Sequence, residues 1–443
     1  MEEPAKILGA IEIPSYIEDD IKKNIQDIGG FGKKITDHIA QNTTDLLDVI
    51  LCGAIILEAS DIHLEPQKDQ IRLRIRIDGV LQDVTLFEQD IYHHLLSRLK
   101  LLSKIKLNVT STPQDGRFTI AMEDELIEIR TSSLPAEYGE SIVMRILDPK
   151  NLIGLEALGL RQDLYEIFQE EIQKPNGMIL VTGPTGSGKT TTLYAFLMKI
   201  QNPEIKIITI EDPIEYHVKS ISQTQVSHQD GYTFSEGLKS IVRQDPDVIL
   251  VGEIRDRETA QIALQAALTG HLVLSTLHTN DAAGTIPRLI DLGANPSSIA
   301  PGVRMIVGER LVRKVCKKCS SLVNPSPEEL AQIKKGLGGL PKEIAKGIPT
   351  VAKAMAGEVK IAKVKEGGCR ACNFTGYKGR NGIFEVFLVD AQMQKFILTN
   401  PPVSAIKELL VKKGMITIYQ SGIIEVANGQ TTLEEVKKVV EAD

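Results

Sequence analysis

The order of apolar and polar positions divides the chain into blocks with different periodicities. Residues 1–148 begin with helical spacing and continue as strands, and residues 160–310 alternate short apolar runs with helical segments. This alternation is typical of a parallel α/β sheet. We therefore predict an α/β chain made of an α+β front domain (1–148), a linker (149–159), a parallel-sheet core (160–310), a smaller cysteine-containing module (311–385) and a C-terminal helical subdomain (386–443).

Local patterns indicate individual elements within these blocks. Short apolar strands are expected at 178–181, 207–210, 248–251 and 272–275, and helices at 257–269, 403–412 and 433–440. Asp256 and Gly270 are suited to cap the first of these helices. The glycine-rich run 29–32 is expected to break an early helix of the front domain.

The strand at 178–181 leads into a phosphate-binding motif. Residues 183–190 read Gly-Pro-Thr-Gly-Ser-Gly-Lys-Thr and precede a helix-forming run. Glycines let the backbone wrap a phosphate, Lys189 can reach the β- and γ-phosphates, and the Thr190 hydroxyl can ligate Mg²⁺. The motif predicts a RecA-like P-loop core that binds a nucleoside triphosphate and Mg²⁺ through Gly183, Pro184, Thr185, Gly186, Ser187, Gly188, Lys189, Thr190 and Thr191.

Polar side chains follow the next three strands of this block. Glu211 ends one strand, Glu253 follows another, and His278 follows the third. Open parallel sheets bind ligands at the carboxyl ends of their strands, so these groups should converge near the phosphate loop. We expect Glu253 to hold Mg²⁺ through its waters, Glu211 to orient the attacking water and His278 to contact the γ-phosphate, with the two glutamate roles open to exchange.

Other polar residues of this block are weaker candidates. His271 is as consistent with helix capping or a core contact as with catalysis. Arg243 and Arg255 flank the strand at 248–251, where phosphate binding and a solvated ion pair are equally compatible with the pattern.

A strand of the front domain carries alternating arginines. Residues 71–77 alternate apolar side chains with Arg72, Arg74 and Arg76, and Asp78-Gly79 is a hairpin turn signal. The arginine face is either a solvated sheet surface or a set of arginine fingers that reach a nucleotide held by another domain or subunit.

Four of the five cysteines form two C-x-x-C pairs. Cys316 with Cys319 and Cys369 with Cys372 are separated by the 49 residues 320–368. Four thiolates supply a closed tetrahedral site for structural Zn²⁺, while unmetallated or redox-active pairs are the alternatives. Cys52 lies in an apolar helical stretch and is expected to be a core residue.

Composition limits the partners and the location of the chain. The net charge of −7 disfavours direct nucleic-acid binding, and no apolar run reaches the length of a membrane helix. The acidic N-terminus lacks a signal-peptide pattern, so we expect a cytoplasmic protein without a transmembrane segment.

Taken together, the motifs resemble those of the ATPases that drive type IV pilus assembly and type II secretion. The resemblance extends from about residue 45 to the C-terminus. It rests on the segments 59–66, 74–79, 113–117, 139–140 with Arg145, 209–215, 244–256, 269–271, 276–280, 369–377 and 379–382, which occur in the family's order.

The resemblance implies a homohexameric ring motor that hydrolyses ATP to drive pilin fibre assembly or type II secretion. It also implies that Arg74 and Arg76 complete the ATP site in catalysis, and that the motor acts on an inner-membrane platform protein at the cytoplasmic face of the inner membrane. The four cysteines favour the assembly and secretion branch over the retraction motors. Type IV pilus extension, type II secretion and DNA-uptake pseudopili remain open.

Three departures from the family pattern stand out. The chain begins close to the front domain, whereas many members carry a further N-terminal domain. Residues 110–112 are Thr-Ser-Thr where basic residues are frequent, and Glu309 replaces the usual glutamine before Arg310.

Two other functions are less consistent with the sequence than the motor. A RecA-like nucleic-acid translocase or helicase is disfavoured by the net charge, the aromatic content of 4% and the absence of tryptophan. A nucleotide-sensing scaffold without turnover is disfavoured because the set of Lys189, Glu211, Glu253 and His278 is intact.

Overall fold

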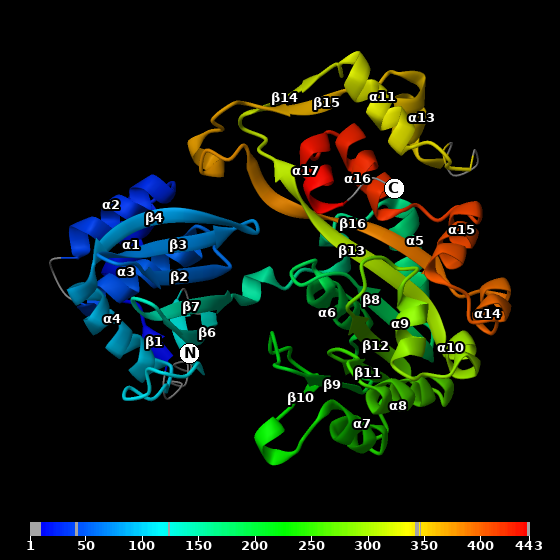
Figure 1. The fold of residues 1–443 in the computed structure, drawn as a ribbon, viewed down its shortest axis with the longest axis horizontal. Coiled ribbons are helices and arrows are strands. Elements are labelled where there is room, and N and C mark those ends of the chain that lie inside the picture. Colours follow the sequence, from blue (N-terminus) through cyan, green and yellow to red (C-terminus); the bar gives the residue numbers. More distant parts are fainter. Residues whose placement is uncertain (1–9, 40–42, 123–124, 342–344, 346, 441–443) are drawn as a thin grey trace. The chain divides into compact units, whose positions relative to one another are not determined.

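The chain forms two compact units. A computed structural model describes residues 10–39, 43–122, 125–341, 345 and 347–440. The first unit comprises residues 1–151 with 365–378, and the second comprises residues 152–364 with 379–443. Each unit has its own sheet and its own apolar core (Figure 1).

The first unit is an α+β domain built on a seven-stranded sheet of order β1-β5-β6-β7-β2-β3-β4. The strands are β1 (Ala10–Glu12), β2 (Asp61–Pro66), β3 (Gln70–Ile77), β4 (Val80–Glu88), β5 (Gln114–Met122), β6 (Glu125–Ala136) and β7 (Gly139–Leu147). The helices are α1 (Ser15–Asn24), α2 (Ile28–His38), α3 (Thr43–Ile56) and α4 (Gln89–Leu102), with the short 3₁₀ turn η1 (Pro149–Asn151).

One face of this sheet is apolar and the other is charged. Along β3 the side chains of Ile71, Leu73 and Ile75 are buried and pack in one core with residues of the four helices. The intervening arginines lie on the opposite face because successive strand residues point to opposite sides. The predicted alternation and the Asp78-Gly79 turn are confirmed, since β3 pairs with β4 across that turn. Cys52 is fully buried in this core, as expected.

The glycine run 29–32 lies inside α2, so the expected helix break was wrong. The Asp27 carboxylate caps the helix by accepting a hydrogen bond from the backbone N–H of Gly30 at 2.8 Å. Gly32 faces β4 so closely that a Cβ atom there would lie 2.4 Å from the carbonyl oxygen of Val84. The lack of a side chain therefore lets the helix pack on the sheet, and this packing outweighs the low intrinsic helix propensity of glycine.

The second unit contains a seven-stranded sheet of order β10-β9-β11-β12-β8-β13-β16. Its strands are β8 (Gly177–Thr182), β9 (Ile207–Glu211), β10 (Ser222–Gln225), β11 (Val248–Val251), β12 (Leu272–Leu277), β13 (Val303–Val315) and β16 (Tyr377–Leu388). The pairs from β10 through β13 are parallel. The four strands expected from the sequence are therefore all present, in one sheet.

Helices cover both faces of this sheet (Figure 1). Met178 and Leu180 of β8 pack with the helices α7 (Phe234–Val242), α8 (Arg257–Leu268), α9 (Thr285–Asp291) and α10 (Pro296–Gly302). Ile179 and Val181 face the opposite core, with α5 (Gln162–Ile172) and α6 (Lys189–Ile200). Burial on both faces explains why these strands read as continuous apolar runs. Asp256 caps α8 as predicted, and it accepts a hydrogen bond from the N–H of Thr259.

The remaining described strands and α-helices lie after β13. They are β14 (Ser320–Val323), α11 (Pro327–Gly336), α13 (Pro349–Ala356), β15 (Ile361–Val364), α14 (Ala391–Ile397), α15 (Val403–Lys412), α16 (Ile418–Ala427) and α17 (Leu433–Val439). β14 and β15 form an antiparallel pair. The module boundaries predicted at residues 310 and 385 fall inside the strands β13 and β16. The division of this part of the chain into modules remains a prediction.

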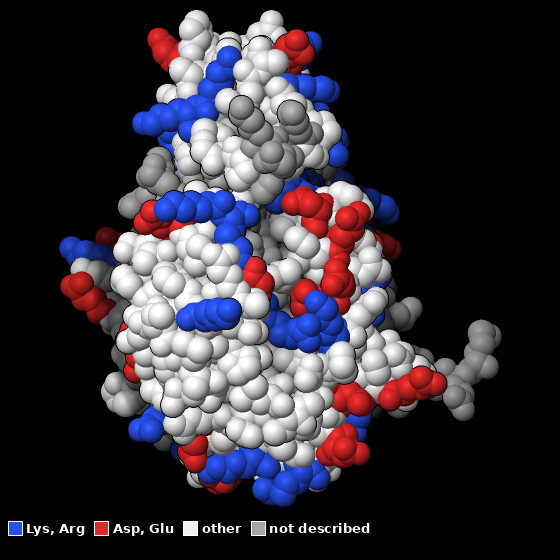
Figure 2. Space-filling model, turned by 90° about the vertical axis from the view of Figure 1, so that its right-hand side faces the viewer, with Lys and Arg blue, Asp and Glu red and all other residues white. Residues whose placement is uncertain are grey.

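A broad area with few charged side chains lies on the side of the molecule where Figure 1 labels α10, α14 and α15 (Figure 2).

Candidate functional site

The loop between β8 and α6 has the backbone of a phosphate cradle. Gly183, Gly186 and Gly188 have φ angles of +152°, +78° and +105°, which residues other than glycine rarely adopt. The loop ends at Lys189, the first residue of α6, so the helix N-terminus points its free N–H groups at the cradle. The hydroxyl oxygen of Ser187 is buried and has no hydrogen-bond partner among the described residues. A loop of this kind can take a phosphate group.

Lys189 is folded back onto its own loop. Its Nζ atom donates hydrogen bonds of 2.9 Å to the carbonyl oxygens of Gly183 and Pro184. Burial lowers the pKa of the ammonium, while the charges of Glu309 and Glu253 act in the opposite direction. The neighbouring hydroxyl of Thr190 belongs to an exposed residue, so it is accessible to a ligand of the loop.

Glu253 and His278 come together at the edge of the sheet. Nε2 of His278 lies 3.4 Å from Oε2 of Glu253, although the two residues follow different strands. Arg255 makes an ion pair with Glu253 and lies 3.7 Å from a carboxylate oxygen of Asp212. Hydrogen bonding to Glu253 is the main cause that raises the pKa of Arg255. Adjacent parallel strands thus deliver a carboxylate, an imidazole and a guanidinium to one place.

Glu211 occupies a different environment, since it is only 3% exposed. The hydroxyl groups of Tyr194 and Thr209 each donate a hydrogen bond of 2.6 Å to its carboxylate, and Gln223 donates a third at 3.3 Å. Burial and the charge of Glu211 raise the pKa of Tyr194 well above its usual range, so this phenol keeps its proton as a donor. Both oxygens of Glu211 are therefore engaged by the protein.

The weaker candidates have local partners. Nδ1 of His271 lies 3.0 Å from the carbonyl oxygen of Ala266 in the last turn of α8, which matches the capping alternative. Arg243 contacts the hydroxyl of Ser240 one turn earlier, while Arg255 belongs to the Glu253 cluster described above.

Each arginine of β3 has a carboxylate or carbonyl partner within the first unit. Arg72 forms two hydrogen bonds of 2.7 Å with Asp83, and Arg74 pairs with Glu65. Arg76 lies 3.3 Å from Asp61 and donates to the carbonyl oxygen of Gly79 at 3.0 Å. The acidic partners come from the neighbouring strands β2 and β4, which place carboxylates on the same sheet face.

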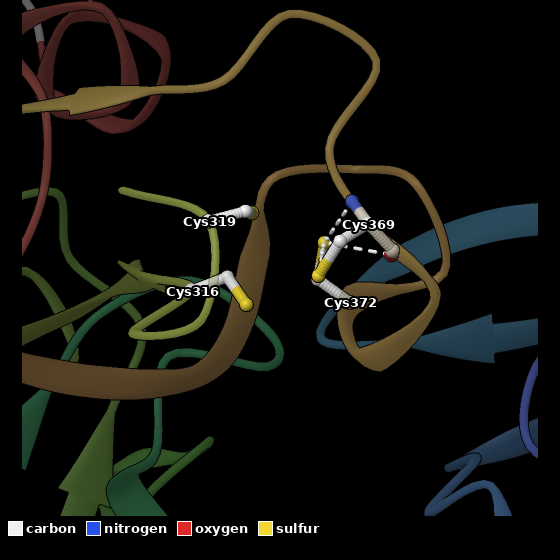
Figure 3. A group of neighbouring side chains, drawn as sticks. All are labelled: Cys316, Cys319, Cys369 and Cys372. Carbon is white, nitrogen blue, oxygen red and sulfur yellow. Dashed lines mark hydrogen bonds between the residues drawn. The ribbon is translucent and has the colours of Figure 1, made fainter. Parts of the chain in front are cut away.

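The two cysteine pairs form one group. The sulfur atoms of Cys316, Cys319, Cys369 and Cys372 all lie within 4.8 Å of one another (Figure 3). A tetrahedral zinc ion with Zn–S distances of about 2.3 Å requires sulfur atoms roughly 3.8 Å apart. The Sγ atoms of Cys369 and Cys372 are 3.7 Å apart, and the N–H groups of Cys369 and Gly376 donate to the Cys372 sulfur at 3.2 Å. Because the four sulfur atoms are this close together, the group fits a four-sulfur metal site.

Several residues that the sequence did not single out tie the site to the rest of the sheet. The hydroxyl of Thr182 accepts a hydrogen bond from the N–H of Thr279 at 3.0 Å, which joins the end of β8 to the loop after His278. The carboxyl group of Glu385 accepts hydrogen bonds from the N–H groups of Ala282 and Ile418, at 2.9 and 3.2 Å. A glutamate inside the apolar run 383–388 at the end of β16 is the signal that could have drawn attention to Glu385.

A glycine-rich loop between a parallel strand and a helix, with a carboxylate and an imidazole at the ends of neighbouring strands, defines a P-loop nucleotide-binding protein. The chain belongs to the family described as "Type II/IV secretion system protein", whose model matches residues 38–438. The resemblance inferred from the motifs is therefore confirmed.

Proteins with similar sequences are secretion and pilus-assembly proteins. The "Type II secretion system protein E" of Dickeya dadantii is 41% identical over 399 residues, which cover 90% of this chain and 76% of that protein. The "Type IV pilus assembly ATPase PilB" of Thermus thermophilus is 38% identical over 433 residues, covering 97% of this chain. This chain spans 46% of the length of the Thermus protein.

Solved structures support the same fold. The pilus retraction motor PilT, determined with bound ADP, is 27% identical, has a TM-score of 0.57, and the match covers 88% of this chain and 95% of that one. The ATPase DotB of Legionella pneumophila superposes with a TM-score of 0.63 at 20% identity, over 90% and 96% of the two chains, which shows the fold alone. The chain thus belongs to a family of secretion and pilus ATPases, and the nucleic-acid translocase alternative is not favoured.

The sequence predicts a chain without a transmembrane helix. Among the helices of the described segments, none is long and apolar enough to cross a membrane.

Proposed function

We propose that this chain is an ATP-hydrolysing motor subunit that powers type II secretion or type IV pilus assembly. The observation that carries the proposal is the phosphate loop at residues 183–190, which lies at the same sheet edge as the Glu253–His278 pair. Phosphoryl transfer depends mainly on positioning and charge neutralisation, and this edge supplies a lysine, a carboxylate, an imidazole and a helix N-terminus.

In this proposal Lys189 leaves the carbonyl oxygens of its own loop and binds the β- and γ-phosphates. The backbone N–H groups of the loop and the Ser187 hydroxyl donate to the phosphate oxygens, with Gly183 to Thr191 forming the nucleotide site. Thr190 and Glu253 would hold Mg²⁺, whose charge would offset the negative charge of the phosphates. His278 responds to the γ-phosphate through its contact with Glu253.

The environments of the two glutamates favour Glu253 over Glu211 as the carboxylate beside the nucleotide. Both oxygens of Glu211 are held by Tyr194, Thr209 and Gln223, so we assign Glu211 a positioning role at the end of β9. The charge of Glu253 acts on Lys189, and Glu253 contacts His278, so we assign it the carboxylate role beside the phosphates and the attacking water.

The remaining features belong to the assembled machine. We propose a homohexamer in which Arg74 and Arg76 leave Glu65 and Asp61 and stabilise charge on the nucleotide during hydrolysis. We propose a structural zinc ion on the four cysteine thiolates, because their spacing fits its geometry. An inner-membrane platform protein is the proposed partner, at the cytoplasmic face of the membrane.

The test of nucleotide use is a comparison of Lys189→Ala with the wild type in Mg²⁺-ATP hydrolysis. Lys189→Ala should lower turnover by at least about 100-fold, because a charge on the transferring phosphoryl group loses its partner. Lys412→Ala is the matched control, since that lysine is 70% exposed and pairs with Glu408 on its own helix. Normal turnover by Lys189→Ala would refute the assigned nucleotide site.

A further inference from the structure

Glu309 lies buried directly beneath the phosphate loop. It follows the part of β13 that pairs with β8, where Gly308 lies opposite Thr182, so the strand carries it to the start of the loop. Glu309 is 2% exposed, and one of its carboxyl oxygens accepts a hydrogen bond of 2.9 Å from the Thr192 hydroxyl in the first turn of α6. The carboxyl group therefore links the floor of the site to the helix that follows the loop.

Two glycines of the loop lie so close to Glu309 that a side chain at either position would clash with it. A Cβ atom on Gly188 would lie 2.2 Å from Oε1 of Glu309, and a Cβ atom on Gly183 would lie 2.5 Å from its carbonyl oxygen. The loop thus rests on Glu309 at both of its ends. A group in this place can support the conformation of the loop from below.

The charge of this carboxyl group is governed by its burial. Desolvation raises the pKa of Glu309 to about 8, while Lys189 and the Thr192 hydroxyl act in the opposite direction. Lys189 on α6 is the charged group that faces it, Arg310 is its neighbour in sequence, and Glu253 bears on the same lysine. At neutral pH the group is therefore mainly a neutral acid and adds no negative charge beside the phosphate loop.

We propose that Glu309 is a positioning residue of the phosphate loop, which it supports as a neutral hydrogen-bonding group, so that loss of its proton weakens the binding of nucleoside di- and triphosphates. The proposal rests on the proposed function of the loop.

The test measures the dissociation constant of a fluorescent ADP analogue with excess Mg²⁺ between pH 7 and 9. For the wild type we expect the constant to rise by up to about tenfold, the limit for a group of this pKa if only the neutral form supports binding. Glu309→Gln should bind comparably at pH 7 and change by less than about twofold over the same range. Glu309→Ala should bind more weakly at every pH, because the loop loses its floor.

The outcomes separate this inference from the proposed function. A wild type that binds the analogue with no dependence on pH, or a Glu309→Gln variant that keeps the full dependence, would overturn the role of Glu309 and leave the nucleotide site intact. A wild type that does not bind at any pH would overturn the proposed function itself. Thermal melting of each variant checks folding, and the wild-type comparison with Glu309→Gln decides the question even if Glu309→Ala does not fold.

Discussion

Nε2 of His278 lies 3.4 Å from a carboxylate oxygen of Glu253, and the two residues follow the adjacent parallel strands β12 and β11. In the proposed function, this pair connects the γ-phosphate contact of His278 to the carboxylate of Glu253. A change at one side chain therefore alters the position and charge environment of the other.

Substitution of Glu253 should separate nucleotide binding from turnover. Glu253→Gln keeps the shape of the side chain but removes its charge, so we expect turnover to fall by about 100-fold or more while nucleotide binding stays within a few-fold. Steady-state hydrolysis and fluorescent nucleotide binding measure the two properties. Glu408→Gln, at an exposed helix position, is the control. Equal losses of binding and turnover would contradict the assignment.

The bond between Tyr194 and Glu211 should contribute to stability. Tyr194→Phe leaves a buried carboxylate without its 2.6 Å donor, which costs about 1–3 kcal/mol in the free energy of unfolding. Glu211→Gln should destabilise as well, and the double variant should lose less than the sum of the two single changes. Urea unfolding provides the free energies. Strict additivity would show that the two side chains do not act together.

Arg76 and Arg72 provide a matched pair on one strand face. Arg76→Ala should lower turnover in the assembled protein by about 10³-fold if it acts as an arginine finger, whereas Arg72→Ala should have little effect. Arg72 is bound to Asp83 through two hydrogen bonds, and the two residues belong to adjacent strands. Equal turnover of both variants would make the arginine face a solvated surface, the alternative reading of the sequence.

Metal content tests the cysteine group. Metal analysis should find about one zinc ion per chain, and Cys369→Ser should lower that content and the melting temperature together. Cys52→Ala is the control, because Cys52 is buried in the apolar core of the first unit and belongs to no C-x-x-C pair. Zinc that survives Cys369→Ser would place the metal elsewhere.

Glu385 should make stability depend on pH. Burial raises its pKa to about 7, so the folded chain keeps a proton that the unfolded chain releases near pH 4.5. The contribution of Glu385 to the free energy of unfolding is therefore fully present below pH 4.5 and is lost as the pH rises to about 7. Glu385→Gln should remove this part of the pH dependence and make the protein relatively more stable above pH 7. Parallel pH profiles for the two proteins would exclude the effect.

The features predicted correctly are those that short-range pattern determines. The phosphate loop, the strands around it and the alternation along β3 all follow from the spacing of apolar, polar and glycine residues. The helix through Gly30 and Gly32 could not be predicted in this way, because the close approach of Gly32 to Val84 is a tertiary contact. Glu211 and Glu309 are bound by Tyr194 and Thr192, which lie in another element of the fold. The burial of the two glutamates therefore follows only from the folded arrangement.

The most direct test of the central claim is Mg²⁺-ATP turnover per chain as a function of protein concentration, with and without single-stranded DNA. A ring motor whose ATP site is completed between subunits predicts turnover per chain that rises with concentration and does not respond to DNA. Turnover that is independent of concentration and stimulated by DNA would contradict the account and indicate a self-contained site with a nucleic-acid partner.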